Sequence, residues 1–145
     1  MKLEDIETMW AEDAQIDKDN LDREALHIAH LHQKYYGILL HENRVLNKKK
    51  EDLKKLRLDK QEFFLLGPTK ETMEKGWQIP ASGKVLRSDV GNYIDADKDV
   101  SDLNLAITFQ MDKIKYLESI ISMITYRNHA LRTAVDFMKF RAGVG

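Results

Sequence analysis

Apolar residues recur every three to four positions along both ends of the chain, and this is the period of an α-helix. Alternate steps of three and four from Val100 pass through Gln110 and Asn128 and otherwise meet only apolar side chains, namely Val100, Leu103, Ile107, Ile114, Leu117, Ile121, Ile124, Leu131, Val135 and Met138. A heptad kept over about five repeats predicts a long helix over 100–145 that packs as a coiled coil.

A second long helix is predicted over 19–66, with Asp19 or Asn20 as its N-cap. Its apolar residues also follow a heptad track: Leu21, Ala25, Ile28, Tyr35, Leu39, Leu46, Leu53, Leu56 and Phe63. The two helices have similar lengths, so we expect them to pair as a long antiparallel helical hairpin. The predicted fold class is all-α.

The remaining segments differ in composition from the two long helices. Pro68, Pro80 and four glycines fall between residues 67 and 91, which predicts an irregular linker or small hairpin over 67–99. Residues 1–20 hold seven acidic residues and two lysines, with Leu3, Ile6 and Trp10 along one side. We therefore expect an acidic amphipathic helix over 1–18, and Ser101 or Asp99 as the cap of the C-terminal helix.

The C-terminal helix is apolar over more than one seam, because further apolar residues adjoin the heptad: Phe109, Tyr116, Met123, Ala130 and Phe137. A chain with only two long helices buries little surface alone, so a helical oligomer is favoured over a monomeric bundle. The residues predicted to mediate oligomerisation are Leu103, Ile107, Ile114, Leu117, Ile121, Ile124, Leu131 and Val135.

Composition narrows the function classes. The 145 residues carry a net charge of −1. They include no cysteine, and this excludes disulfides, thiolate metal sites and thiol catalysis. No apolar run approaches the ~20 residues of a membrane span, and the acidic N-terminus does not resemble a secretion signal. We expect a soluble, cytoplasmic protein that does not contact membranes.

Candidate catalytic and cofactor motifs are incomplete. His27, His30 and His32 lie close together, but no neighbouring carboxylate completes a metal ligand set, so ordinary interfacial histidines are the better interpretation. Gly83-Lys84 lacks the first glycine and the hydroxyl of a phosphate-binding loop. Asp95–Asp99 begins like a calcium loop, but Val100 replaces its turn glycine, which favours helix capping. We expect no catalytic residues, no metal and no cofactor.

One stretch is strongly basic. Residues 44–60 hold eight basic and three acidic residues, a net charge of +5, and Phe63 and Phe64 follow. Cations beside aromatic rings suit single-stranded nucleic acid, because phosphates pair with the cations and bases stack on the rings. A solvated helix face and two core phenylalanines are the alternative. The candidate DNA-binding residues are Lys48, Lys50, Lys54, Lys55, Arg57 and Lys60.

The order of several short motifs resembles the UvsY-type recombination mediators of T-even-type phages, nearly from end to end. The motifs are Met1–Ile6, Lys55–Asp59, Asp95–Val100 and Phe140–Gly143. The resemblance implies a non-enzymatic, homo-oligomeric ring, a hexamer or heptamer, that binds single-stranded DNA in the cytoplasm of the infected bacterial host. It also implies two protein partners, the phage single-strand-binding protein that it helps to displace and a RecA-like recombinase of the UvsX type that it loads.

The resemblance singles out two basic residues. The family's basic motif reads Leu-Lys-Ala-Arg-Leu-Asp-Tyr-Tyr, and its Lys and Arg fall on Lys55 and Arg57 by position. Its tyrosine pair is not reproduced, so Phe63 and Phe64 either stack on bases or belong to the core. The sequence leaves two hypotheses: a DNA-binding recombination mediator, or a helical scaffold or adaptor oligomer whose lysines only keep a long helix soluble.

Overall fold

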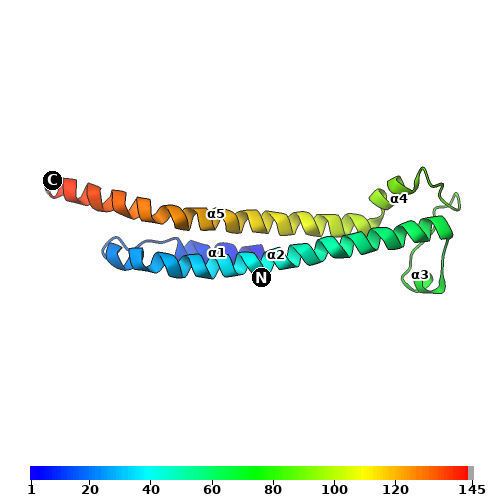
Figure 1. The fold of residues 1–145 in the computed structure, drawn as a ribbon, viewed down its shortest axis with the longest axis horizontal. Helices are drawn as coiled ribbons and strands as arrows, with labels where there is room; N and C mark the ends of the chain where they lie inside the picture. The colour runs from blue at the N-terminus through cyan, green and yellow to red at the C-terminus, as the bar shows by residue number, and fades with distance from the viewer. Residues whose placement is uncertain (144–145) are drawn as a thin grey trace. The chain divides into compact units, whose positions relative to one another are not determined.

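The computed structural model describes residues 1–143, which form five α-helices: α1 (Leu3–Asp13), α2 (Leu21–Leu66), α3 (Lys70–Glu74), α4 (Val90–Ala96) and α5 (Lys98–Arg141). No strand occurs among these residues, which confirms the all-α class (Figure 1). The chain folds into two compact units. Unit 1 comprises Met1–Asn43 and Asp112–Gly145, and unit 2 comprises Arg44–Met111. Within each unit, α2 and α5 run antiparallel.

Unit 1 is a three-helix arrangement in which α1 lies against the paired segments of α2 and α5 (Figure 1). The apolar side of α1 supplies Ile6 and Trp10, both buried, and the Trp10 ring meets the Tyr35 ring edge-on at 5.4 Å between centroids. The side chains that fill the rest of this core are Leu31, Tyr35, Leu39, Ile114, Leu117, Ile120, Ile124 and Leu131. Burial of these residues holds α1 in place, because a short helix is marginal alone.

Charged groups fix the end of α1. Two backbone carbonyls there, those of Asp13 and Ala14, accept hydrogen bonds of 3.1 Å from Nη2 of the buried Arg127. A cation at a helix C-terminus also interacts favourably with the helix dipole. The Asp13 carboxylate accepts bonds from Lys34 Nζ at 2.6 Å and from the Tyr35 hydroxyl at 2.8 Å. The end of α1 is therefore bonded to both long helices of unit 1.

The position of α1 changes which side of α5 is buried. The heptad predicts Ile121 and Asn128 on the inner side, but Ile121 is half-buried and Asn128 is exposed, while Ile120 and Arg127 are buried. The physical reason is that α1 covers the flank of α5 that carries Arg127. On α2, the heptad track also passes through His32, between Ile28 and Tyr35, and predicts it on the inner side, but His32 is exposed.

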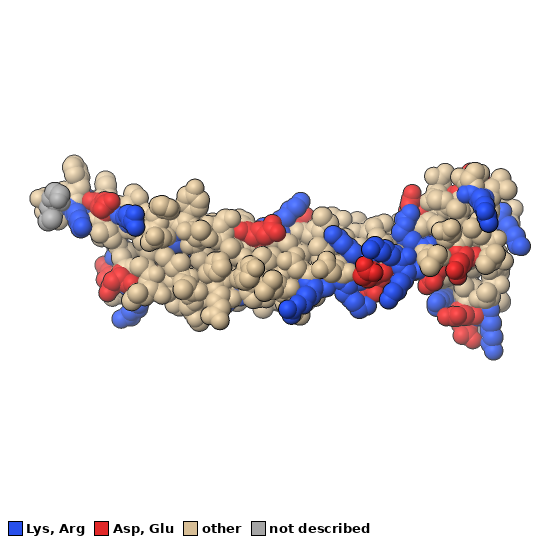
Figure 2. All heavy atoms as spheres, in the orientation of Figure 1, with Lys and Arg blue, Asp and Glu red and all other residues tan. Residues whose placement is uncertain are grey.

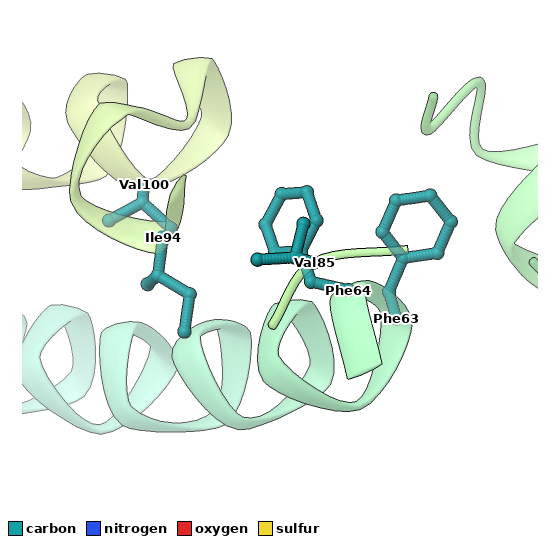
Figure 3. Close-up of a cluster of buried hydrophobic side chains, with 5 residues drawn as sticks. All are labelled: Phe63, Phe64, Val85, Ile94 and Val100. Atoms are coloured by element: carbon teal, nitrogen blue, oxygen red, sulfur yellow. The ribbon is translucent and has the colours of Figure 1, made fainter. Parts of the chain in front are cut away.

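Unit 2 has its own core, built around the end of α2. Buried side chains from α2, α4, α5 and the segment between α3 and α4 form a cluster of Phe63, Phe64, Val85, Ile94 and Val100 (Figure 3). The helix ends at Leu66 because Gly67 adopts a positive φ of 92° and Pro68 follows it. The positive φ lets the chain turn back so that Val85 reaches Phe64.

Helix boundaries differ from the sequence expectations. The first helix ends at Asp13 rather than near residue 18, and two short helices interrupt the segment expected to be irregular. The cap of α5 is Asp97 rather than Ser101 or Asp99, because α5 begins two residues early and the Asp97 carboxylate accepts a hydrogen bond from the Val100 N–H at 3.2 Å. The predicted span 100–145 includes residues 144–145, which lie outside the described residues.

The bonds at Asp13 generate a pH prediction. Burial alone would raise the pKa of this carboxyl, but hydrogen bonds from Lys34 and Tyr35 outweigh it, and the pKa lies below its ordinary value of 3.8. A depressed pKa contributes stability above the unfolded value, and that stability is lost as the pH falls through the folded value. We expect Asp13→Asn to lower the free energy of unfolding by about 1 kcal/mol at neutral pH.

Urea unfolding of both proteins at a series of pH values measures this effect. The difference between wild type and Asp13→Asn should shrink as the pH falls below about 4, and the exposed neighbour Glu12, changed to Gln, should have little effect. An equal difference at every pH would contradict the role assigned to the Asp13 carboxylate.

Candidate nucleic-acid interface

The basic residues of α2 within unit 2 do not all have the same surroundings. Lys50 and Lys55 are exposed and make no ion pair within residues 1–143. Lys48 and Lys54 are also exposed, and each pairs only with a carboxylate on its own helix, at 2.7 Å to Asp52 and 3.1 Å to Glu51. Figure 2 shows Lys and Arg side chains gathering along this part of α2. Four lysines are therefore open to an anionic ligand.

The pKa of Asp52 reflects the positive surroundings. The hydrogen bond from Lys48 lowers the pKa of this carboxyl most, and the charges of Lys55 and Lys49 lower it further. Exposed pairs of this kind contribute little to stability, so Lys48 can exchange its partner for a phosphate at small cost. The net effect is a positive surface in which two carboxylates, those of Glu51 and Asp52, are embedded and easily displaced.

Arg57 already has an ion-pair partner within unit 2. Its Nη1 lies 2.9 Å from a carboxylate oxygen of Asp95 on α4, and the side chains are 40% and 67% exposed. The pair is therefore in contact with water, where the attraction is weak. Of the two residues singled out by the resemblance, Lys55 is unpaired within the described part of the chain and Arg57 has an internal partner.

The inclusion of Lys60 among the DNA-binding residues needs correction. Lys60 is only 3% exposed, and its Nζ lies 3.1 Å from Asp97 and 3.0 Å from Asp99. The same ammonium lies 3.8 Å from the centroid of the Trp77 ring. A lysine so enclosed is a structural residue of unit 2, because moving its charge to an external phosphate would leave two carboxylates unpaired near the core.

The aromatic pair after the basic segment belongs to the core. Phe63 and Phe64 are buried, and the Phe63 ring contacts the Trp77 ring at 5.5 Å between centroids. Figure 3 shows the Phe64 ring close to Val85 inside the cluster. Neither ring is available to stack on a base, so the core alternative describes both phenylalanines.

The residues predicted to mediate oligomerisation pack mostly inside the chain. Ile114, Leu117, Ile124 and Leu131 are buried in unit 1, and Ile107 is buried in unit 2. The other three, Leu103, Ile121 and Val135, are half-buried. The heptad seam of α5 thus packs mostly against the chain's own helices. The expectation that this seam forms the interface between subunits needs correction.

A different face of α5 is left open. In unit 1 this face presents exposed side chains at steps of three and four, all apolar except Thr133. We call it the outer seam, and it consists of Met123, Tyr126, Ala130, Thr133, Phe137 and Phe140. Next to it is a hollow of about 240 Å³ that the seam shares with Trp10, Ala14 and Ile16. An exposed apolar face of this extent is typical of an interaction surface.

Other candidate chemistry finds no support within residues 1–143. No three histidine, aspartate or glutamate side chains come together there in an arrangement that could hold a metal ion. The rings of His27 and His30 contact each other instead, at 4.9 Å between centroids. None of the described helices is both long enough and apolar enough to cross a membrane.

Comparison with known families agrees with the all-α fold of the chain and with the basic segment of α2. The family model described as "Recombination, repair and ssDNA binding protein UvsY" matches residues 9–144. The chain belongs to the UvsY family. The UvsY family is thus one of recombination and repair proteins that bind single-stranded DNA. Among curated proteins, none matches this sequence.

Two solved structures share the UvsY fold with this chain. Both are crystal structures of the bacteriophage T4 recombination mediator protein UvsY. One is 18% identical, with 97% of this chain and 99% of that chain covered, and the other is 20% identical, with 98% of each covered. The TM-score is 0.77 in both cases. The fold is therefore retained although most side chains differ.

Sequence reasoning missed two features of this UvsY-family site. Trp77 lies in a segment expected to be irregular, and its contact with Lys60 depends on the turn after Gly67. The sequence predicts a capping role for the run Asp95–Asp99 without singling out Asp97, whose carboxylate accepts the Val100 N–H bond and also binds Lys60. The alternation of acids in Asp95–Asp99 was a signal that these carboxylates have partners elsewhere, but it does not identify them.

Proposed function

We propose that this chain binds single-stranded DNA through the exposed lysines of α2. The observation that carries this proposal is that Lys50 and Lys55 have no ion pair within residues 1–143, while Lys48 and Lys54 have only weak pairs on their own helix. Arg57 joins them when a phosphate displaces Asp95. The phosphate backbone supplies most of the affinity of such contacts and makes it dependent on salt.

We further propose that the chain acts as a recombination mediator without catalysing a reaction itself. Bound to several phosphates along α2, a strand would be held with its bases accessible, and this favours a RecA-like recombinase over a competing single-strand-binding protein. The family description supports recombination, repair and single-stranded DNA binding. The loading of a UvsX-type recombinase, the displacement of the phage single-strand-binding protein and a location in the host cytoplasm are our proposals.

The double variant Lys50→Ala with Lys55→Ala tests the DNA contact. We expect it to bind a labelled single-stranded oligonucleotide at least about tenfold more weakly at moderate salt, because two phosphate contacts are removed per subunit. Fluorescence anisotropy at several salt concentrations measures both the affinity and its dependence on salt, whose slope should fall by about 1.4 per subunit.

The matched control removes the same charge elsewhere, by Lys18→Ala with Lys70→Ala, both exposed and without an ion pair in the part of the chain that the structure describes. It should bind as wild type does. Equal binding by Lys50→Ala/Lys55→Ala and wild type would contradict the proposed interface. No binding by any of these proteins at moderate salt would instead favour the scaffold or adaptor function.

We also propose that copies of the chain associate through unit 1, through two apolar surfaces on different helices. One is the outer seam of α5. The other is a face of α2 that exposes Leu26, Tyr36 and Leu40, with Gly37 beside them. A side chain at Gly37 would meet no atom within 4 Å in this chain, so the chain's own packing does not require glycine there. Glycine on an open apolar face lets another helix approach closely.

Two different surfaces on one subunit suit a ring. When the outer seam of each copy binds the apolar α2 face of the next copy, the contact is heterologous. Such contacts close into a ring if the rotation between copies allows it. A hexamer or heptamer is what the family resemblance implies for this chain. A ring would also repeat the lysine surface of α2, so that weak contacts add through a high effective concentration.

Replacing Tyr126 and Phe137 by Asp tests the outer seam. Both side chains are exposed, so we expect the helix content to be unchanged while the mass measured by sedimentation falls below that of the wild-type assembly. Affinity for a long oligonucleotide should fall as well, because the repeated contacts are lost.

The control, Asn104→Asp with Thr108→Asp, adds the same charge to an exposed side of α5 in unit 2, where neither proposed surface lies. It should leave the mass unchanged. A smaller mass in the control and wild-type mass in the Tyr126/Phe137 variant would contradict the proposal, because it would show that the subunits associate through the part of α5 in unit 2.

A further inference from the structure

Unit 2 has an open hollow next to the basic segment. It measures about 540 Å³ and lies between the last two turns of α2 and the segment that leads from α3 to α4. Three exposed leucines line it: Leu58 at 55%, Leu66 at 76% and Leu86 at 69% exposure. The remaining lining residues are Gln61, Glu62, Leu65, Lys84, Val85 and Arg87. The lining of this hollow thus combines exposed apolar side chains with charged ones.

The segment that forms one wall is held by its middle residue. Val85 is buried in the core cluster against Phe64, and its N–H donates a 3.4 Å hydrogen bond to the Phe64 carbonyl (Figure 3). Because Val85 points into the core, its neighbours Lys84 and Leu86 are left at the surface. The wall is therefore a positioned part of unit 2.

The charges of the hollow favour an anionic ligand. Lys84 and Arg87 make no ion pair within residues 1–143, and Glu62 is the one acid in the lining. Elsewhere in unit 2 several of the basic residues have a carboxylate partner, as Arg57 and Lys60 do. Two unpaired cations beside exposed leucines are otherwise unexplained by the fold.

The hollow continues the lysine surface of α2. Lys50, Lys54, Leu58 and Gln61 follow one another at steps of four, four and three, so they lie on one face of the helix. Each step of four advances about 6 Å along the axis. A ligand bound at Lys50 and Lys54 therefore reaches Leu58 and the hollow within one further turn.

We propose that this hollow is a subsite for unstacked bases of the same single-stranded DNA, and this rests on the proposed function. Lys84 and Arg87 bind the phosphates that follow those bound on α2, while bases pack on Leu58, Leu66 and Leu86. Single-strand binders combine cations that follow the phosphate backbone with side chains, usually aromatic ones, on which the bases pack. Here Phe63 and Phe64 are buried, and the exposed leucines supply that contact instead.

Two variants separate the two kinds of contact. Leu58→Ser with Leu86→Ser removes the apolar surface, and Lys84→Ala with Arg87→Ala removes the cations. Each is titrated against an oligothymidylate and against an abasic strand of the same length, which has the same phosphates and no bases. All four side chains are exposed or outside the core cluster, and circular dichroism checks that the helix content is unchanged.

The leucine variant should bind oligothymidylate about fivefold more weakly, because two apolar contacts with the bases are lost, and it should bind the abasic strand as wild type does. The cation variant should lose affinity for both strands and show a lower salt slope, by about 1.4 per subunit. The Lys18→Ala/Lys70→Ala protein, which loses the same charge, should bind both strands as wild type does.

Wild-type affinity for oligothymidylate in the leucine variant, or an equal loss for both strands, would overturn the base subsite. If Lys50→Ala/Lys55→Ala still weakens binding in that case, the proposed function stands without the subsite. A wild-type protein that binds neither strand would overturn both proposals.

Discussion

Unit 2 depends on one buried charge. The Lys60 ammonium is enclosed by the Asp97 and Asp99 carboxylates and by the face of Trp77. These partners come from the start of α5 and from the segment after α3, so a single side chain of α2 joins three parts of the unit. A buried ammonium is costly unless it is paired. The arrangement is therefore favourable only when all three segments are in place, and Asp97 caps α5 in the same arrangement.

The same constraint divides the basic segment by function. Lys60 neutralises carboxylates inside the unit and Arg57 pairs with Asp95 at its edge, while Lys50 and Lys55 remain unpaired among the described residues. A chain with net charge −1 can bind a polyanion when its charges are segregated in this way. The acids of Asp95–Asp99 bind Arg57 and Lys60, the two cations nearest the core. The lysines that come earlier in α2 are left for phosphate.

The fold class and the two long helices could be predicted from sequence, because their apolar period persists over many turns. The inner side of α5 was harder to predict: Ile120 and Arg127 are buried by α1, and a short helix elsewhere in the chain leaves no mark on the period of α5. The lysines of α2 were recognisable by composition, but the burial of Lys60 was not, since its partners are about forty residues away in sequence. Most of the residues expected to mediate oligomerisation are buried inside the chain. A heptad identifies an apolar seam without saying whether the partner is the same chain or another.

Chemical unfolding of Lys60→Met tests the central role of this lysine most directly. Methionine replaces the aliphatic part of the lysine side chain but leaves Asp97 and Asp99 without their cation, so the free energy of unfolding should fall by about 2 kcal/mol. The exposed Lys50→Met should change it by less than about 0.5 kcal/mol. Adding Asp97→Asn to Lys60→Met should recover part of the loss, because one unpaired carboxylate is removed. A Lys60→Met protein as stable as wild type would contradict the account, since it would show that unit 2 does not depend on this buried charge.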